Sequence, residues 1–457
     1  MMFQTINPAT EEVINDYETM SQKEVMDIAN KAHNCFLEWR DLSLTERAEY
    51  FKKLAEVLKK NKEEYGMLIS LEMGKPLKDA IKEIEKCVLA VEVYIENAEE
   101  WLEEESVKAD GIEHKVIFQP LGVILAVMPW NFPFWQAFRF IIPTILAGNT
   151  ALLKHASNVT GSALAIEESF KKAGFPENVF RTIIADHDTV GKLIEADILR
   201  GVSLTGSINA GKRIAELAGK NLKKVVLELG GSDPFIVLED SDLDFAAQGA
   251  VLGRFQNNGQ SCISSKRFIV MENVVDDFSK KFASLTNKLK IGDPMEDGTK
   301  LGSLVNKEAL ETIEKQVKDA VDKGAKILTG GKRIEGKGFF YEPTIITNTK
   351  PNMEIVKDEV FGPVAAIISV KDENEALKIA NSTKFGLGGS VWTKDIEKGK
   401  EIAKKIESGT VFVNSITKSD PRMPFGGIKQ SGLGRELSKY GMKEFVNVKG
   451  FNVYEQK

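Results

Sequence analysis

A cysteine in a turn-forming segment is the first residue of this chain whose type and setting could do chemistry. Cys262 ends the segment Phe255-Gln-Asn-Asn-Gly-Gln-Ser-Cys262, in which Gly259 and its polar neighbours predict a turn or loop. A loop presents a thiol to a substrate better than a helix face does. Cys35 and Cys87 lie instead in helical patterns typical of small buried side chains. Cys262 is therefore the candidate nucleophile, although a lone loop cysteine does not by itself identify an enzyme.

A cysteine nucleophile needs a base or a positive field to form its thiolate. The chain has four histidines, and none lies in a motif typical of a cysteine hydrolase. Glu228 is the acidic alternative, because it follows the apolar residues 225–227 and precedes a leucine and two glycines. Burial there would raise the pKa of its carboxyl, as a general base near neutral pH requires. The competing interpretation is a surface glutamate at the end of a strand.

The segment Met128-Pro-Trp-Asn-Phe-Pro-Phe134 places an amide directly after a predicted strand. The side-chain N–H groups of Asn131 could hold the oxygen of a tetrahedral adduct, together with the backbone N–H of Cys262. The competing interpretation is a turn asparagine between two prolines.

A glycine-bounded segment, Gly206-Ser-Ile-Asn-Ala-Gly211, follows an apolar run and opens a helical pattern. Backbone N–H groups and the helix dipole at such a position can face a pyrophosphate. The segment is not the G-x-G-x-x-G fingerprint, and an ordinary helix cap is the simpler interpretation when it is taken alone.

An alternation of β-rich and helical segments predicts the framework that positions these residues. The expected strands are 123–128, 150–154, 179–184, 201–204 and 225–229. The expected helices between them are 162–173, 189–195 and 210–218. This order is typical of a parallel, doubly wound sheet, the usual architecture of a dinucleotide site. Amphipathic helix patterns precede it at 21–40, 44–73 and 77–101, and a second α/β pattern follows Pro234, with helices expected at 273–289, 307–323 and 373–381.

Composition limits the classes of protein to which the chain can belong. Its 457 residues and 42% hydrophobic content suit two or more domains around a cleft. A net charge of −6 without basic blocks argues against a nucleic-acid partner. Three cysteines without CxxC spacing predict neither a disulfide framework nor a metal site, and fit a reducing, cytoplasmic setting. The apolar stretch 121–153 is interrupted by prolines and Arg139, so we expect buried core and no membrane partner, and the first residues predict no signal peptide.

Three of these segments together resemble the aldehyde dehydrogenase superfamily, whose signatures are PWNFP, LELGG and GQxC-type motifs. They occur here in family order, and the resemblance extends from Asn7 to Tyr454. Further matching segments are 204–207, 358–363 and 424–432. The resemblance implies an α/β fold with a Rossmann-like parallel-sheet cofactor domain, an α/β catalytic domain and a β oligomerisation arm. The corresponding ranges are 1–100 with 121–229, then 230–430, and finally 101–120 with 431–457.

The resemblance also implies a mechanism. Cys262 attacks the aldehyde, Asn131 stabilises the oxyanion, and hydride passes from the thiohemiacetal to the nicotinamide. Glu228 then activates the water that releases the acid. The arm and tail imply a homodimer or homotetramer.

The same resemblance assigns residues to the cofactor. Ser207, within the segment from Gly206 to Gly211, binds pyrophosphate, Trp130 lines the site, and Glu359 and Phe361 hold the nicotinamide ribose and ring.

One departure from the family pattern concerns the choice between NAD and NADP. The usual Lys-Pro-Ser/Ala-Glu appears here as Lys154-His-Ala-Ser157. The glutamate of the family pattern would repel a 2′-phosphate, and Ser157 removes that repulsion while Lys154 remains as a positive partner. The sequence therefore predicts that NADP is accepted and preferred, with NAD also possible.

Within the superfamily, the segments 153–156, 229–235, 253–257 and 434–438 resemble succinate semialdehyde dehydrogenases of the short bacterial type. In these enzymes an arginine at the position of Arg139 pairs with the substrate carboxylate. Gln256 stands where longer relatives carry a second arginine. Arg139 could instead be a structural residue of a core helix, in which case it needs a buried partner.

Other functions stay open at this point. The same chemistry could act on lactaldehyde, glyceraldehyde or glutarate semialdehyde. CoA-dependent acyl transfer is a second class, against which Glu228 in its hydrolytic motif argues. A non-catalytic binding protein is a third class, disfavoured by the presence of Cys262, Asn131 and Glu228.

Overall fold

The computed structural model describes residues 2–456, which form two large sheets, a three-stranded arm and a two-stranded hairpin. The six-stranded sheet has the spatial order β17 (Gly432–Leu433), β9 (Lys224–Glu228), β8 (Leu199–Thr205), β5 (Val123–Met128), β6 (Thr150–His155) and β7 (Phe180–Thr182). All of its pairs are parallel except β17 with β9. The expected parallel sheet and the α/β class are confirmed.

The strand order of this sheet reverses beside β5. From β5 the chain builds outward through β6 and β7, then returns to add β8 and β9 on the other side. Ligands of open parallel sheets bind outside the carboxyl ends of the strands at such a reversal. The residues that follow β5 and β8 therefore lie where a ligand site is expected.

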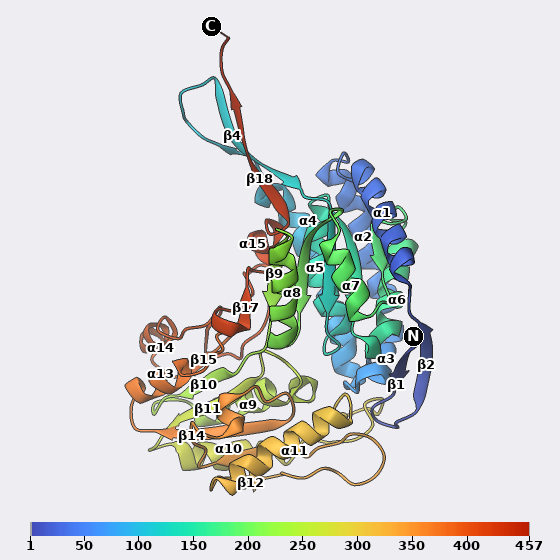
Figure 1. Ribbon diagram of the computed structural model, residues 1–457. Coiled ribbons are helices and arrows are strands. Elements are labelled where there is room, and N and C mark those ends of the chain that lie inside the picture. Colours follow the sequence, from blue (N-terminus) through green and yellow to red (C-terminus); the bar gives the residue numbers. More distant parts are fainter. Residues whose placement is uncertain (1, 457) are drawn as a thin grey trace.

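Helices cover both faces of the six-stranded sheet (Figure 1). Those that connect its strands are α5 (Pro133–Leu146), η1 (Ser157–Val159), α6 (Thr160–Lys172), α7 (His187–Glu195) and α8 (Ile208–Lys220). Those that precede it are α1 (Gln22–Trp39), α2 (Leu44–Lys60), α3 (Lys62–Met73) and α4 (Leu77–Trp101). The single helix expected over 44–73 is thus two helices, because the chain leaves helical geometry at Asn61, whose φ is −108° and ψ 17°.

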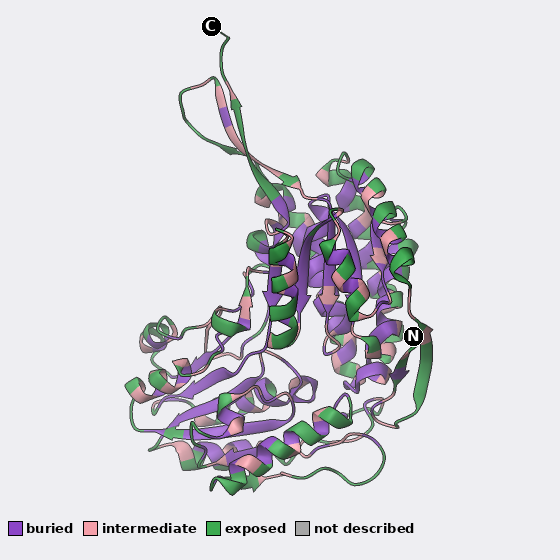
Figure 2. Ribbon diagram, viewed as in Figure 1, coloured by how far each residue is buried: buried purple, intermediate pink, exposed green. Residues whose placement is uncertain are grey.

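Every residue of α5 is buried, including Arg139. Its prolines do not prevent the helix, since Pro133 occupies the first turn and Pro143 lies near the carboxyl end. The interpretation of 121–153 as core is confirmed, and Figure 2 shows this core as the buried centre of the upper body. Within residues 2–456, no helix has both the length and the apolar composition needed to cross a membrane.

The seven-stranded sheet follows Glu228 in the chain and lies in the lower body of Figure 1. Its order is β12 (Lys326–Thr329), β13 (Thr344–Thr347), β14 (Val364–Val370), β11 (Ser265–Met271), β10 (Asp233–Val237), β15 (Ser390–Trp392) and β16 (Phe412–Val413). The helices between them are α9 (Leu243–Phe255), η2 (Gln256–Gly259), α10 (Val275–Thr286), α11 (Lys307–Asp322), α12 (Glu354–Lys357), α13 (Glu373–Asn381) and α14 (Ile396–Ala403).

A thin arm extends from the upper body in Figure 1. It consists of β3 (Glu105–Ser106), β4 (Glu113–Pro120) and β18 (Val446–Val453), the last two paired along their whole length. The remaining elements are β1 (Met2–Ile6), β2 (Val13–Glu18), η3 (Lys429–Ser431) and α15 (Ser438–Met442). The domain boundaries stay a prediction, but β17 lies in the range assigned to the tail and yet extends the six-stranded sheet.

Candidate active site

Cys262 lies between two cavities at the carboxyl ends of β5 and β8. The first, which we call the α4–α5 cavity, is lined by residues of those helices together with Gln256, Cys262 and Ser419. The second, the Trp130 cavity, is lined by Trp130, Ser207 and their neighbours, and again by Cys262. The cysteine is therefore reachable from two sides.

An unusual turn carries Cys262 between α9 and β11. Three successive residues of η2 have left-handed φ angles, at 54° for Asn257, 58° for Asn258 and 73° for Gly259. Asparagine and glycine are the residues that tolerate this geometry best. Arg254 holds the turn from beneath, since its guanidinium donates hydrogen bonds to the carbonyls of Gly259 and Gly362.

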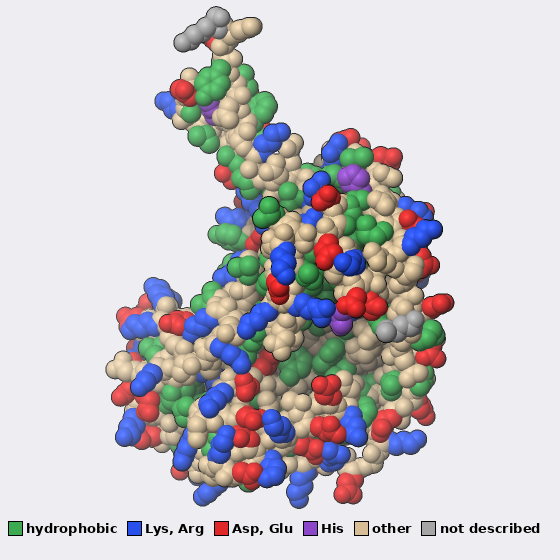
Figure 3. Space-filling view, in the orientation of Figure 1, with side chains coloured by type: hydrophobic (Ala, Val, Ile, Leu, Met, Phe, Trp, Pro, Cys, Tyr) green, Lys and Arg blue, Asp and Glu red, His purple; other side chains and the backbone are tan. Residues whose placement is uncertain are grey.

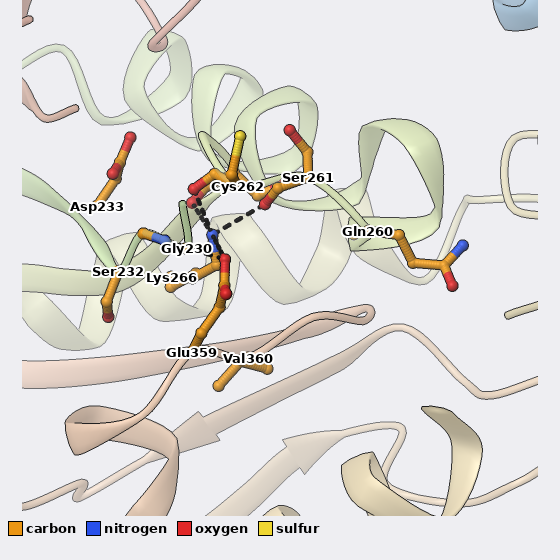
Figure 4. A network of polar contacts seen from close by, with 12 residues as sticks. Gly230, Ser232, Asp233, Gln260, Ser261, Cys262, Lys266, Glu359 and Val360 are labelled. Atoms are coloured by element: carbon orange, nitrogen blue, oxygen red, sulfur yellow. Dashed lines mark hydrogen bonds and ion pairs between the residues drawn. The ribbon is translucent and has the colours of Figure 1, made fainter. Parts of the chain in front are cut away.

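Lys266 is a buried cation directly below the nucleophile, and Figure 4 shows it pointing at the turn. Its Nζ donates to the carbonyl oxygens of Ser261, at 2.9 Å, and of Cys262, at 2.8 Å. It also forms an ion pair with Glu359 at 3.7 Å. The N–H groups of this ammonium are thus bonded to carbonyl oxygens, and its positive charge acts to lower the pKa of the Cys262 thiol.

Burial nevertheless decides the protonation of the thiol. It raises the pKa of Cys262 to about 12, although Arg139 and Lys266 act in the opposite direction. Glu359 and Glu228 raise this pKa further. The thiol is thus protonated near neutral pH, and any attack by its sulfur requires the transfer of that proton.

Glu228 is buried at the end of β9, with 2% of its surface exposed, which removes the surface interpretation. Neither carboxyl oxygen has a hydrogen-bond partner among the described residues. Burial and the nearby carboxylate of Glu436 raise its pKa well above the ordinary value, while Arg139 and Arg435 oppose the change. Gly426 leaves room for this carboxyl, because a Cβ there would lie 2.7 Å from Glu228 Oε1.

Asn131 follows β5 and touches the Cys262 turn. Its Nδ2 donates to the carbonyl of Gln260 at 3.0 Å, and its own carbonyl accepts from Asn257 Nδ2 at 2.9 Å. It is 4% exposed and borders the Trp130 cavity. The structure thus places the amide of Asn131 against the turn that carries Cys262. Glu228 borders neither cavity, and its link to the thiol is the electrostatic effect of its carboxyl on the pKa of Cys262.

The Trp130 cavity contains most of the residues expected to hold a dinucleotide. Ser207 caps α8, and its Oγ accepts from the N–H of Ala210 at 3.2 Å. Glu359 accepts from the N–H of Gly231 at 3.0 Å, and the rings of Trp130 and Phe361 meet edge to face at 5.7 Å. Gly206 also borders this cavity.

Gly211 is not brought to either cavity. It lies inside α8 against Leu229, where a Cβ would come within 2.6 Å of a leucine methyl. Its N–H is already bonded to the carbonyl of Ser207. The expected cofactor contact is corrected to a packing role, since this glycine lets α8 approach the sheet.

A third cavity, which we call the Lys154 cavity, lies on the far side of α8. Lys154, His187 and Arg213 border it together with apolar side chains of α7 and α8. Lys154 is 8% exposed, and burial lowers its pKa. Ser157 is an exposed residue three positions further along, at the start of η1.

Arg139 borders the α4–α5 cavity from α5, as Gln256 does from η2. Its guanidinium forms an ion pair with the buried Glu436 and donates to Thr205 Oγ1 at 3.1 Å. It therefore has the buried partner that a core arginine requires. A substrate carboxylate at Arg139 would share it with Glu436.

The sequence patterns did not predict several residues that the structure places in or beside the site. Lys266 begins the apolar strand β11, and a lysine in such a run could have been recognised as one needing buried partners. Glu436 lies within the segment 434–438 quoted for its resemblance, but no role was given to it. Among the described residues, no group of three or more His, Cys, Asp or Glu is placed to hold a metal ion.

Comparisons with known proteins agree with this geometry. The profile of the aldehyde dehydrogenase family matches residues 1–451. A Synechocystis sp. protein named probable succinate-semialdehyde dehydrogenase NADP(+) is 46% identical over 449 residues, covering 98% of this chain and 99% of that protein. Succinate-semialdehyde dehydrogenase NADP(+) 1 of Mycobacterium tuberculosis is 43% identical over 452 residues, covering 98% and 99%.

A solved structure is similar over the same length. The crystal structure of succinic semialdehyde dehydrogenase from Streptococcus pyogenes in complex with NADP+ superposes with a TM-score of 0.97 at 38% sequence identity, covering 99% of this chain and 100% of that one. A family profile that spans nearly the whole sequence and full-length relatives at 43% and 46% identity lead to one conclusion: this chain belongs to the aldehyde dehydrogenase family.

Proposed function

We propose that this enzyme oxidises succinate semialdehyde to succinate with NADP as the preferred hydride acceptor. The observation that carries the proposal is the position of Cys262, which borders both the α4–α5 cavity and the Trp130 cavity. An aldehyde bound in the first and a nicotinamide bound in the second would meet at one sulfur atom. The names of the relatives at 43% and 46% identity support the same substrate and cofactor.

The chain's own residues suit a dinucleotide phosphate. The first N–H groups of α8 have no partner within the helix, and Ser207 opens it beside the Trp130 cavity. Beyond α8, Lys154, His187 and Arg213 gather around the Lys154 cavity without a glutamate at position 157. A 2′-phosphate would meet two cations there. When bound, the nicotinamide would accept the hydride, which carries two electrons.

In the proposed reaction the Cys262 sulfur adds to the aldehyde carbon as the S–H bond breaks, and the thiol proton passes to a solvent water. The π electrons of the carbonyl move to its oxygen. Asn131 Nδ2 and the N–H of Cys262 donate to the oxygen of the adduct. After hydride departs from the carbon, a thioester remains on Cys262. Glu228 accepts a proton from water, whose oxygen adds to the thioester carbon, and the acid leaves as the thiol is restored.

The α4–α5 cavity suits an aldehyde with an anionic end. Cations of α4 and α5, among them Lys86 and Arg139, border it together with Phe132, Trp135 and Phe425. Apolar walls with a few charged groups fit a short carbon chain that ends in a carboxylate. Gln256 adds a neutral donor at the same wall.

We further propose that the enzyme works in a reducing compartment, the cytoplasm, as a homodimer or homotetramer. Cys35, Cys87 and Cys262 are all free thiols. The arm exposes apolar side chains, visible at the top of Figure 3, that a partner subunit would cover: Ile112, Val448, Phe451 and Tyr454.

A panel of aldehydes tests the proposed activity. We expect kcat/KM for succinate semialdehyde to exceed that for butanal by roughly 100-fold, because only the former carries a carboxylate. Glutarate semialdehyde, lactaldehyde and glyceraldehyde, each assayed with NADP and NAD, complete the panel. Butanal outperforming succinate semialdehyde would contradict the proposal, as would product formation that depends on coenzyme A.

Glu228→Gln should separate the two halves of the reaction. We expect one burst of reduced cofactor per site in rapid mixing, followed by turnover slowed about 100-fold or more, because the amide cannot take the proton of water. In the unchanged enzyme thioester hydrolysis should accelerate as pH rises, since the raised pKa keeps Glu228 protonated at lower pH. Cys262→Ala is the control without a burst. A burst slowed as much as turnover would give Glu228 a part in thiol activation as well.

Ser157→Glu should reverse the preference for NADP. The new carboxylate would repel the 2′-phosphate and offer an acceptor to the ribose hydroxyls of NAD. Ser157→Gln adds the same bulk without charge and serves as the matched control. The measurement is the ratio of kcat/KM for the two cofactors, and an unchanged ratio in Ser157→Glu would show that other residues set the choice of cofactor.

Sedimentation velocity at micromolar concentration should show a species larger than one chain. Replacing Val448 and Phe451 by glutamate puts charges on two exposed positions of β18 and should shift the distribution toward monomer. Leu222→Glu, at a residue that is 94% exposed outside the arm, is the control. A monomeric unchanged enzyme would refute the proposed assembly.

A further inference from the structure

We propose that Lys86 is the second cation that recognises the far carboxylate of the substrate, an inference that rests on the succinate semialdehyde activity proposed above. Lys86 lies on α4 and borders the same cavity as Cys262, Gln256 and Arg139. It thus offers a positive charge in a cavity where position 256 carries a neutral amide.

The cations of the α4–α5 cavity differ in whether their charge is already neutralised. Lys75 forms a buried ion pair with Glu83, and Lys82 pairs with Asp79 at 3.4 Å. Arg139 pairs with Glu436. Within residues 2–456 no carboxylate forms an ion pair with Lys86, so this ammonium keeps its charge available to a ligand.

The acids nearest to Lys86 are committed elsewhere. Glu83 accepts from the Lys75 ammonium and, through Oε1, from two backbone N–H groups at the start of α5. Asp420 is held by Arg422, whose Nε and Nη2 donate to its two oxygens at 2.9 and 2.6 Å. Neither carboxylate turns toward Lys86 as an ion-pair partner.

Two neutral contacts hold the ammonium in the cavity wall. Its Nζ donates to Ser419 Oγ at 2.6 Å and lies 4.2 Å from the centre of the Trp135 ring. Ser419 and Trp135 are themselves buried, at 8% and 3% exposure. An ammonium has three donors, so two remain after Ser419, and the serine hydroxyl keeps its own proton to donate. A carboxylate placed here would receive bonds from both side chains.

The protonation of Lys86 agrees with this role. Burial, and next the neighbouring Arg139 guanidinium, lower its pKa to about 8, against the opposing effect of Cys87, Glu83 and Asp420. The ammonium is therefore charged at neutral pH and loses its charge as pH rises through about 8. An anion bound beside it would stabilise the charged form.

The test compares succinate semialdehyde with butanal, which has the same four-carbon chain without the carboxylate. We expect Lys86→Met to lower the ratio of the two kcat/KM values about 30-fold, chiefly through the KM for succinate semialdehyde. Lys86→Arg keeps the charge and should retain most of the ratio. Lys78→Met, at an exposed lysine of the same helix that does not border the cavity, is the matched control and should change the ratio less than about twofold.

A pH series on the unchanged enzyme gives a second readout that needs no variant. The ratio should fall as pH rises above about 8, because Lys86 loses its charge there, whereas protonation of Cys262 affects both aldehydes alike. A ratio near one in the unchanged enzyme at neutral pH would contradict the proposed function itself. A high ratio in Lys86→Met would overturn the role of Lys86 alone. If that variant does not fold, a ratio in the unchanged enzyme that stays constant from pH 7 to about 9 would do the same.

Discussion

The burial of positive charge around Cys262 is the constraint on which the rest of the site depends. Lys266 and Arg254, which bind carbonyls of the turn that carries Cys262, are both fully buried. Leaving such a charge without partners costs on the order of 3–5 kcal/mol. Hydrogen bonds from these cations to carbonyl oxygens of separate segments offset this cost. Arg254, for example, joins the turn before Cys262 to the carbonyl of Gly362, which follows Phe361 of the Trp130 cavity.

The site takes its residues from segments that belong to both large sheets. The turn that carries Cys262 belongs to the connection between α9 and β11, whereas Asn131 follows β5 of the other sheet. Two hydrogen bonds link these segments, one from Asn131 to Gln260 and one from Asn257 to Asn131. The nucleophile and its proposed oxyanion donor are therefore positioned by each other as well as by their own strands.

From the sequence, the five parallel strands of the six-stranded sheet could be predicted because their apolar runs are short and separated by glycine and helical patterns. The sixth strand, β17, was not predicted, since it is two residues long and pairs with a strand about 200 positions earlier. The turn at Cys262 was recognisable for the same local reason. The break at Asn61 was missed, because the helical pattern continues through it and only the backbone angles reveal it. Lys86 and Glu436 were missed for a different reason. The role of Lys86 depends on Ser419, which is 333 residues away in the sequence. The role of Glu436 depends on its ion pair with Arg139 of α5.

Arg139 shows how such long-range pairs alter an interpretation made from position alone. Its guanidinium lowers the pKa of both Glu228 and Glu436, yet it forms its ion pair with Glu436. Two carboxylates in one buried region cannot both ionise at low cost beside a single engaged guanidinium. Burial raises the pKa of both carboxyls, but the ion pair with Arg139 opposes that rise at Glu436, so we expect Glu228 to ionise at the higher pH. Glu228, without hydrogen-bond partners among the described residues, is thus left protonated and available as the group whose ionisation the chemistry can use.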